Sequence, residues 1–339
     1  MLRKICVCAV FLLLVYAMPA GAAVKVEWDA TAGGDDANSE LAWRTGFTTS
    51  GDWSLGPHSV FFLKNQIAID QADEEWQGKL ERCYIRYEQG PVRLNLGRQG
   101  VSWGIGWFFR PTDLVTPLTP LAQEETRPGK ALAVLRWSTS ALTAVDFIAG
   151  DEMIGARSEW RIGPTNLRLL GVYQPGYIHS LGFDFQGGLA GFYGEGAYHW
   201  AEASFDQGEL AGLVGWRKVL RSGNQLYLEY YRNDLSKAGP ELAALWSENK
   251  NRELRYSNQN YLAVGLQIPW DQLTTCSITA IANLDDGGVI LQGIADVQLS
   301  DNLTVRGALM TVAGAGGTEF RTRVQGAKVG ATVEMKYFF

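Results

Sequence analysis

Residues 328–339 read KVGATVEMKYFF, and this stretch alternates between two kinds of side chain. One set is apolar: Val329, Ala331, Val333, Met335, Tyr337 and Phe339. The other is mostly small or polar: Gly330, Thr332, Glu334, Lys336 and Phe338. Successive side chains of a β-strand point to opposite faces, so this period of two predicts a strand with one apolar and one polar face.

The same alternation recurs along the chain, while no segment after residue 23 has the ~20 consecutive apolar residues of a spanning helix. In 153–163, for example, Arg157, Glu159 and Arg161 alternate with less polar neighbours. The pattern predicts eighteen strands, at 24–33, 40–50, 58–69, 79–89, 91–98, 131–138, 141–149, 153–163, 165–173, 177–187, 189–202, 209–220, 224–233, 259–268, 272–284, 287–299, 302–313 and 328–339.

A soluble β-sandwich would also have strands with one apolar face, but three features favour a transmembrane antiparallel up-and-down β-barrel. The 12 Trp, 13 Tyr and 14 Phe residues gather near strand ends, as in the aromatic girdles of membrane barrels. The polar faces carry charges in mid-strand. The joints after even-numbered strands are tight turns, except a somewhat longer one after the second, whereas all the long joints follow odd-numbered strands. We therefore expect about 18 strands (16 if one hairpin is misassigned), short periplasmic turns and long external loops.

The first 23 residues have the layout of a secretory signal peptide. Arg3 and Lys4 precede an apolar run that ends in small residues up to Ala23. We expect residues 1–23 to be removed and residues 24–339 to form a single barrel domain. Removing two of the 30 basic side chains leaves 28 against 36 acidic ones, which argues against a nucleic-acid partner. Cys83 and Cys276 fall on lipid-facing positions of distant strands, so we expect free thiols.

The polar faces predict a water-filled interior, because a barrel of 16–18 strands is too wide for its side chains to fill. Three of the inward positions, Arg82, Arg86 and Arg93, lie on neighbouring strands. Such a row of guanidinium groups needs acidic partners or a passing anion, or it faces an inserted loop. The predicted inward charges are Lys25, Glu27, Asp29, Arg44, Lys64, Arg82, Arg86, Glu88, Arg93, Asp146, Arg157, Glu159, Arg161, Arg168, Asp184, Glu195, Arg217, Glu229, Asp296, Arg306 and Glu334.

Two motifs resemble those of known outer-membrane proteins. The terminal residues 336–339, KYFF, resemble the C-terminal signal of outer-membrane barrels, which marks Tyr337 and Phe339 as an assembly signal. Residues 97–114 contain GRQ, WGIG and PTDL, which resemble a segment of porin-like and alginate-export-type proteins. The resemblance implies location in the outer membrane, insertion by the barrel-assembly machinery, contact with outer-membrane lipid, and passive or facilitated passage of small hydrophilic solutes.

The segment 99–130 is the third external connection, and in general porins, which this chain resembles in architecture, that loop folds into the barrel. Its glycines, its apolar aromatic residues and its prolines suit an inserted loop. An external extension of the fifth strand is the alternative. Strand parity leaves Arg98 facing outward unless Gly97 carries a bulge. The candidate pore residues are Arg82, Arg86, Arg93, Arg98, Trp103, Trp107, Arg110, Asp113, Glu124 and Glu125.

Two other functions remain open: a structural or adhesive barrel without transport, and an outer-membrane hydrolase. The chain has only three histidines, and the neighbours His179 and Ser180 point to opposite faces of a strand, so they cannot form a dyad directly. No metal-ligand spacing and no phosphate-binding glycine motif occur at strand-to-helix junctions. We therefore expect no enzyme activity and no cofactor.

Overall fold

The computed structural model describes residues 23–35, 42–70, 76–116, 129–176, 178–188, 191–201, 205–234, 256–323 and 328–339. They form eighteen strands, so the predicted strand number is confirmed. The strands are β1 (Ala23–Asp35), β2 (Ala42–Gly56), β3 (Ser59–Asp70), β4 (Gln77–Gln89), β5 (Val92–Gln99), β6 (Lys130–Ser138), β7 (Thr143–Gly150), β8 (Met153–Ile162), β9 (Thr165–Tyr173), β10 (Ile178–Gln186), β11 (Phe192–Ala201), β12 (Glu209–Val219), β13 (Gln225–Asn233), β14 (Asn260–Pro269), β15 (Thr274–Asn283), β16 (Val289–Ser300), β17 (Leu303–Ala313) and β18 (Val329–Phe338).

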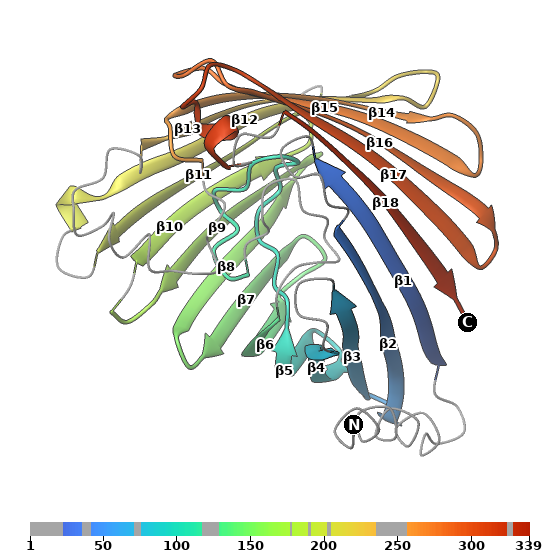
Figure 1. Cartoon of the computed structure of the whole chain (residues 1–339). Coiled ribbons are helices and arrows are strands. Elements are labelled where there is room, and N and C mark those ends of the chain that lie inside the picture. The colour runs from blue at the N-terminus through green and yellow to red at the C-terminus, as the bar shows by residue number, and fades with distance from the viewer. Residues whose placement is uncertain are drawn as a thin grey trace.

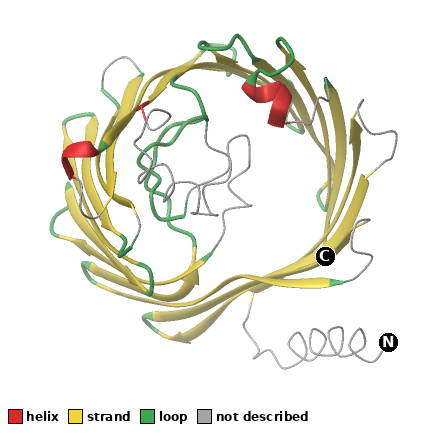
Figure 2. Ribbon diagram, turned by 60° about the vertical axis from the view of Figure 1, so that its left-hand side comes forward, coloured by secondary structure: helices red, strands yellow, loops and turns green. Residues whose placement is uncertain are grey.

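The strands close into a single antiparallel barrel. Each strand pairs with its neighbours in sequence, and β18 pairs with β1 over the register Glu27↔Phe338 to Asp35↔Gly330. Figure 1 shows β1 and β18 side by side, and Figure 2 shows the closed ring. Because a closed ring has no edge strand, the ladder hydrogen bonds of every strand are made within the barrel. The predicted up-and-down barrel is therefore confirmed.

The two faces of the wall differ as the alternation predicts. On β17 and β18 the outward residues Leu309, Val333 and Met335 are exposed to the surroundings of the barrel. Between them the inward residues Arg306 and Glu334 lie opposite each other in the register. The barrel thus has an apolar outer surface and a polar inner one, which is the distribution of a barrel surrounded by lipid.

The two ends of the barrel differ in their connections. At the short-turn end, which holds the joints after even-numbered strands, β2 runs six residues beyond its predicted end and leaves only Pro57 and His58 before β3. The prediction of a longer joint there was wrong, because Gly51–Gly56 continues the ladder with β3 through a register shift at Ser54 and Gly56. At the long-loop end lie the short 3-10 helix η2 (Phe205–Gln207) and helix α3 (Glu319–Arg323). In the described residues, no helix combines the length and apolar character needed to cross a bilayer.

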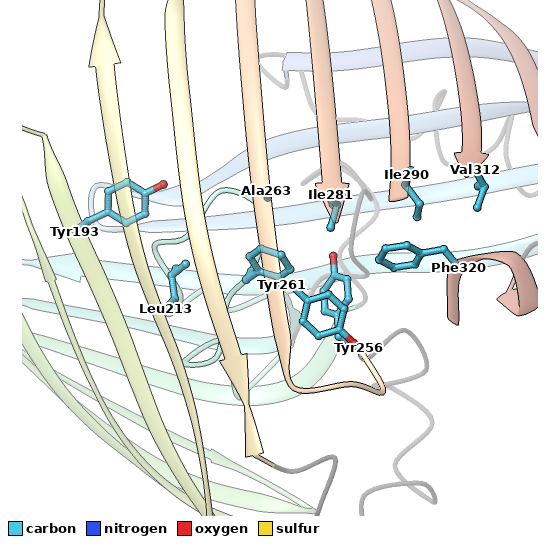
Figure 3. Packing of buried hydrophobic residues seen from close by; sticks show 10 residues of the cluster. Tyr193, Leu213, Tyr256, Tyr261, Ala263, Ile281, Ile290, Val312 and Phe320 are labelled. Atoms are coloured by element: carbon cyan, nitrogen blue, oxygen red, sulfur yellow. The ribbon is translucent and has the colours of Figure 1, made fainter. Parts of the chain in front are cut away.

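Apolar side chains inside the barrel are buried where segments of the chain press against the wall. One cluster joins Phe109, Tyr256, Tyr261 and Phe320 to inward residues of β11, β12 and β14–β17 (Figure 3). A second cluster joins Trp103, Leu114 and Val115 to inward residues of β6–β9. Phe109, Trp103, Leu114 and Val115 all come from the segment between β5 and β6, so this segment supplies part of both clusters.

Cys83 on β4 and Cys276 on β15 are free thiols, as predicted. They pair in register with Leu63 and Ile268 at positions that alternate with the inward residues. Ten strands lie between β4 and β15 in one direction around the ring and six in the other, so the two thiols are beyond disulfide reach.

The difference between the two faces predicts opposite responses to one substitution at neighbouring positions. We expect Leu309→Arg to lower the free energy of unfolding in lipid vesicles by about 2–4 kcal/mol, because it places a cation in hydrocarbon near the middle of β17. The control, Ala308→Arg, places the same group on the inner wall beside open space and should have little effect. Equal losses in the two variants would contradict the assignment of faces.

Candidate constriction formed by a loop inside the barrel

The described segment 100–116, here called the inner loop, leaves the end of β5 and lies against the inner face of the wall. In Figure 1 it is the teal trace that follows β5 into the barrel, and Figure 2 shows loop segments within the ring of strands. Its start is fixed by Gln99, which is buried and donates from Nε2 to the carbonyl oxygens of Leu132 (3.0 Å) and Asn95 (3.2 Å).

Glu195, an inward residue of β11, holds the inner loop at two places. One carboxylate oxygen accepts hydrogen bonds from the backbone N–H groups of Ile105, at 2.5 Å, and Gly106. The other accepts from Thr112, through its backbone N–H at 3.1 Å and its hydroxyl at 2.6 Å. Only 3% of Glu195 is exposed, so the carboxylate exchanges water for these four donors.

Glu229 on β13 holds the residues that follow. Its carboxylate accepts hydrogen bonds from the backbone N–H groups of Trp107 (2.5 Å), Phe108 (2.9 Å) and Phe109 (3.0 Å). The Tyr193 hydroxyl donates a fourth hydrogen bond at 2.6 Å. Buried backbone N–H groups are costly unless they are paired, and the described strands beside the inner loop already pair with each other in the closed ladder. Together the two glutamates accept from the backbone of Ile105–Phe109 without interruption.

The inner loop also contains its own hydrogen bonds, which set a compact turn. Arg110 donates from Nε to the carbonyl oxygen of Gly106 at 2.6 Å, and the backbone N–H of Asp113 donates to Arg110. A Cβ at Gly106 would lie 1.8 Å from the Phe109 carbonyl oxygen, so this turn requires glycine. The Thr116 hydroxyl accepts from the N–H of Val101 and donates to its carbonyl, both at 2.8 Å.

Aromatic side chains fix the inner loop on both sides of the glutamates. Trp103 is 2% exposed, and the Arg157 guanidinium of β8 lies 5.5 Å from the centre of its ring. Phe109 is equally buried and stacks on Tyr231 with 4.8 Å between ring centres. Cation–π contacts and offset aromatic pairs stabilise such buried packing by about 0.5–2 kcal/mol each. The inner loop therefore rests on the wall from β6 to β14.

The candidate residues of the inner loop differ in their surroundings. Trp103 and Asp113 are buried, and Asp113 accepts from the Trp103 N–H at 3.2 Å, so both act within the loop rather than on the lumen surface. Trp107 is 48% exposed and presents its ring to the lumen. Arg110 is partly buried. Glu124 and Glu125 lie outside the described residues.

The candidate arginines on β4 and β5 do not act as one row. Arg93 forms a two-pronged ion pair with Glu88, with nitrogen–oxygen distances of 2.8 and 3.0 Å. Arg86 donates to the Tyr84 hydroxyl at 3.1 Å. The guanidinium of Arg82 packs over Gly100, where a Cβ would lie 2.7 Å from it, so Arg82 lies at the base of the inner loop.

Arg98 keeps the outward parity of its strand. The register Tyr84↔Gly97 and Cys83↔Arg98 continues without a shift, although Gly97 has a φ of 129°. A Cβ at Gly97 would lie 2.3 Å from the Cys83 carbonyl oxygen, so glycine accommodates the close approach of β4 without a bulge. The Arg98 side chain lies against Gly129, where a Cβ would be 3.0 Å from its Cγ.

A network of ion pairs that the sequence did not single out crosses the wall from β6 to β10. Asp146 accepts from Arg136 at 3.1 Å and from Arg157 at 2.6 Å. Glu159 lies 3.0 Å from Arg136 and 3.5 Å from Arg168, and Arg168 in turn pairs with Asp184 at 2.7 Å. These charges neutralise one another along the wall, so this face of the lumen stabilises the barrel without needing a solute.

The wall on the other side of the ring borders open space. A hollow of about 790 Å³ lies at the long-loop end of β1–β3 and β16–β18, and most of its lining residues point inward, among them Asp35, Arg44, Asp70 and Met310. Small residues such as Gly33 and Ala308 line this hollow, so the wall extends little into the lumen at these positions. In the described part of the chain, the inner loop contacts β6–β14, and this hollow lies on the opposite wall.

Ser180 and His199 form a hydrogen bond across β10 and β11, with 2.8 Å between Oγ and Nδ1. The prediction that Ser180 does not pair with His179 stands, but the sequence reading missed this cross-strand partner. Ser180 is 1% and His199 2% exposed, so the pair is closed to a solute in this structure.

Sequence comparison finds no match, either to a family model or among curated proteins. Comparison of structures does find similar folds. The chain is similar to OccD3 (OpdP) of Pseudomonas aeruginosa, with a TM-score of 0.63 and 10% identity over 94% of this chain and 91% of that one. It is also similar to a triple mutant of the Rhodopseudomonas blastica porin, with a TM-score of 0.51 and 12% identity over 94% of this chain and all of that one. The fold is therefore that of outer-membrane porins.

The hydrogen bonds of Glu229 predict how the inner loop responds when they are lost. In Glu229→Ala the amides of Trp107, Phe108 and Phe109 lose a charged acceptor, and such bonds are worth about 1.5–3 kcal/mol each. We expect hydrogen exchange at these three amides to accelerate by at least about tenfold, measured by mass spectrometry. Glu88→Ala is the control, since Glu88 pairs with Arg93 near the short-turn end. Unchanged exchange in Glu229→Ala would show that the carboxylate does not hold the loop.

Proposed function

We propose that the protein is an outer-membrane channel for the diffusion of small hydrophilic solutes, and that the inner loop is its constriction. The observation that carries this proposal is the position of residues 105–109, held inside a closed barrel by Glu195 and Glu229. Export through the signal peptide at residues 1–23 and the inserted segment 99–130 are parts of the same proposal.

The outer surface supports the membrane location. Large apolar side chains are exposed at outward positions all round the barrel, including Ile85, Phe147, Phe183, Val214, Ile278 and Leu309. In water such a surface would be unfavourable, whereas hydrocarbon accommodates it. The closed ladder leaves no strand edge exposed to lipid.

The interior supports passage rather than a solid core. Eighteen strands enclose a lumen wider than their side chains can fill, and a hollow lies against β1–β3 and β16–β18, on the wall opposite the strands that hold the inner loop. Side chains of both signs line this hollow, including Asp35, Arg44, Asp70 and Lys328. A solute that crosses the barrel on this side passes between charged wall residues and the inner loop, so size and charge both affect its rate.

A structural or adhesive barrel is the alternative, and single-channel recording separates the two. Refolded protein in a planar bilayer should give stepwise ion currents if it is a pore. A folded, inserted barrel without such currents would refute the channel and favour the structural function.

Deletion of the inner loop tests the constriction. Replacing 103–117 with a short glycine–serine bridge should leave the barrel folded, because its ladder hydrogen bonds run between strands. Conductance should rise, solutes too large for the parent should pass, and ion preference should shift, since Trp107 and Arg110 are removed while Arg82 and Glu229 are uncovered. The same conductance and selectivity in a folded deletion variant would end the constriction proposal.

The terminal aromatic residues provide a test of assembly. Tyr337 is partly exposed on the outer face, and its ring lies 4.9 Å from that of Phe339, which is 71% exposed. We propose that this pair is read by the barrel-assembly machinery. The double variant Tyr337→Ser/Phe339→Ser should reduce the amount of heat-modifiable barrel in the outer membrane severalfold. A parallel change of the inward Phe338 to Ser is the control, and normal insertion of the double variant would refute the signal.

A further inference from the structure

The inner loop has four aromatic residues, Trp103, Trp107, Phe108 and Phe109, and Trp107 is the most exposed of them. Trp103 and Phe109 are each 2% exposed and fill space against the wall, and Phe108 packs over Gly265, where a Cβ would lie 2.5 Å from its ring. Trp107 is 48% exposed. Most other large apolar side chains that are this exposed lie on outward strand positions, where lipid covers them. Trp107 lies inside the barrel, where water is the surrounding medium.

The exposed ring is held in a fixed orientation from one side. Its indole stacks on the Tyr227 ring with 4.3 Å between ring centres and an angle of 20° between planes. Tyr227 is 2% exposed and donates from its hydroxyl to Gln225 at 2.7 Å. The Arg217 guanidinium lies 5.5 Å from the centre of the Tyr227 ring and donates to the same Gln225 oxygen at 2.6 Å. Tyr227 is thus fixed by two contacts besides Trp107.

The backbone of Trp107 is fixed as well. Its N–H donates to Glu229 at 2.5 Å, and the next two N–H groups donate to the same carboxylate. The backbone and one face of the indole are already ordered in the protein without a ligand. Binding of a ligand to the other face therefore costs little conformational entropy of the Trp107 side chain. A merely space-filling aromatic residue would be buried, as Trp103 and Phe109 are.

Trp107 lies toward the short-turn end of the lumen. Tyr227 is the third residue of β13, which begins at the short-turn end, and Trp107 follows the loop residues bound to Glu195. The indole therefore lies where the inner loop comes near the short-turn opening. An aromatic face at such a point offers stacking to any flat ring, with little demand on the exact hydrogen-bonding groups.

We propose that Trp107, supported by Tyr227, is a binding subsite for cyclic solutes with a flat ring face, such as a pyranose sugar. This inference rests on the proposed channel function and names the class of solute that the constriction retains. The subsite discriminates a ring from an open chain, because only the ring presents a rigid apolar face to the indole.

Glucose and sorbitol are matched probes for this subsite, since they have nearly the same size and hydroxyl content but only glucose forms a ring. Each is titrated against single-channel current in a planar bilayer, with correction for the conductivity of the bulk solution. In the parent, glucose should reduce the current with half-saturation at a concentration at least about threefold below that of sorbitol. Equal effects of glucose and sorbitol on the parent would overturn the proposal.

Three variants assign the preference to the indole. Trp107→Leu retains an apolar side chain over Tyr227 without a flat face, and it should abolish the preference for glucose. Trp107→Phe should retain most of it. Trp270→Ala removes a Trp that is 74% exposed in the turn after β14, and it should leave the preference unchanged. A preference that persists in Trp107→Leu would overturn the proposal.

The outcome also separates this subsite from the channel itself. A protein that conducts but shows no preference refutes the subsite and leaves the channel standing. If the folded barrel does not conduct, equilibrium dialysis of labelled glucose against the detergent-solubilised protein still tests the subsite. Binding that is at least about threefold weaker in Trp107→Leu supports the subsite, and equal binding refutes it.

Discussion

The arrangement inside the barrel depends on two buried carboxylates. A segment that leaves the wall and enters the lumen has backbone N–H groups with no strand to pair with them, and burying such groups unpaired is unfavourable. Glu195 and Glu229 resolve this by accepting from the amides of Ile105–Phe109 and from Thr112. The carboxylates in turn need donors once they are removed from water. The inner loop supplies N–H donors and the wall supplies carboxylate acceptors, so the contact between them satisfies the buried polar groups of both.

This pairing divides the inner wall into regions with different roles. From β6 to β10 the inward charges pair with one another in a continuous network of ion pairs that includes Arg136, Asp146 and Glu159. The inner loop packs on this part of the wall through Trp103, Leu114 and Val115, and on β11–β14 its backbone is held by Glu195 and Glu229. On β16–β18 and β1–β3 ion pairs such as Arg306–Asp296 and Lys336–Glu27 lie in the wall, beside the open hollow. In the described residues the inner loop therefore lies against one side of the lumen, opposite the hollow.

Most of the fold could be predicted from the sequence, because it depends on local periodicity. Alternation in 329–339, turn residues such as Gly163-Pro164 and parity along each strand together predict the strands and the inward charges. The ladder extension of β2 to Gly56 could not be predicted, since it depends on pairing with β3 rather than on its own composition. Glu195 and Glu229 were placed inward, but their partners in the inner loop lie 83 to 122 residues away along the chain. One signal was present: in the register they face Asp184, Leu213, Gly215 and Ala263, none of which is a cation.

The inner loop is also tied to the long-loop end of the barrel, and this limits how it can move. The ring centres of Phe109 and Tyr256 are 4.9 Å apart. Tyr256 in turn contacts Tyr261 of β14 and Phe320 of helix α3 (Figure 3). Glu319, next to Phe320, accepts from the Tyr261 hydroxyl at 2.6 Å and from Asn283 at 2.8 Å. The hydrogen bonds to Glu195 and Glu229 therefore hold the inner loop in the half of the barrel nearer the short turns. The packing of Phe109 on Tyr256 holds it to the segments at the long-loop end. A displacement of Phe109 would expose buried apolar surface in the inner loop, around Tyr256 and on α3. These three segments therefore form one packed unit, and none of them moves easily without the others.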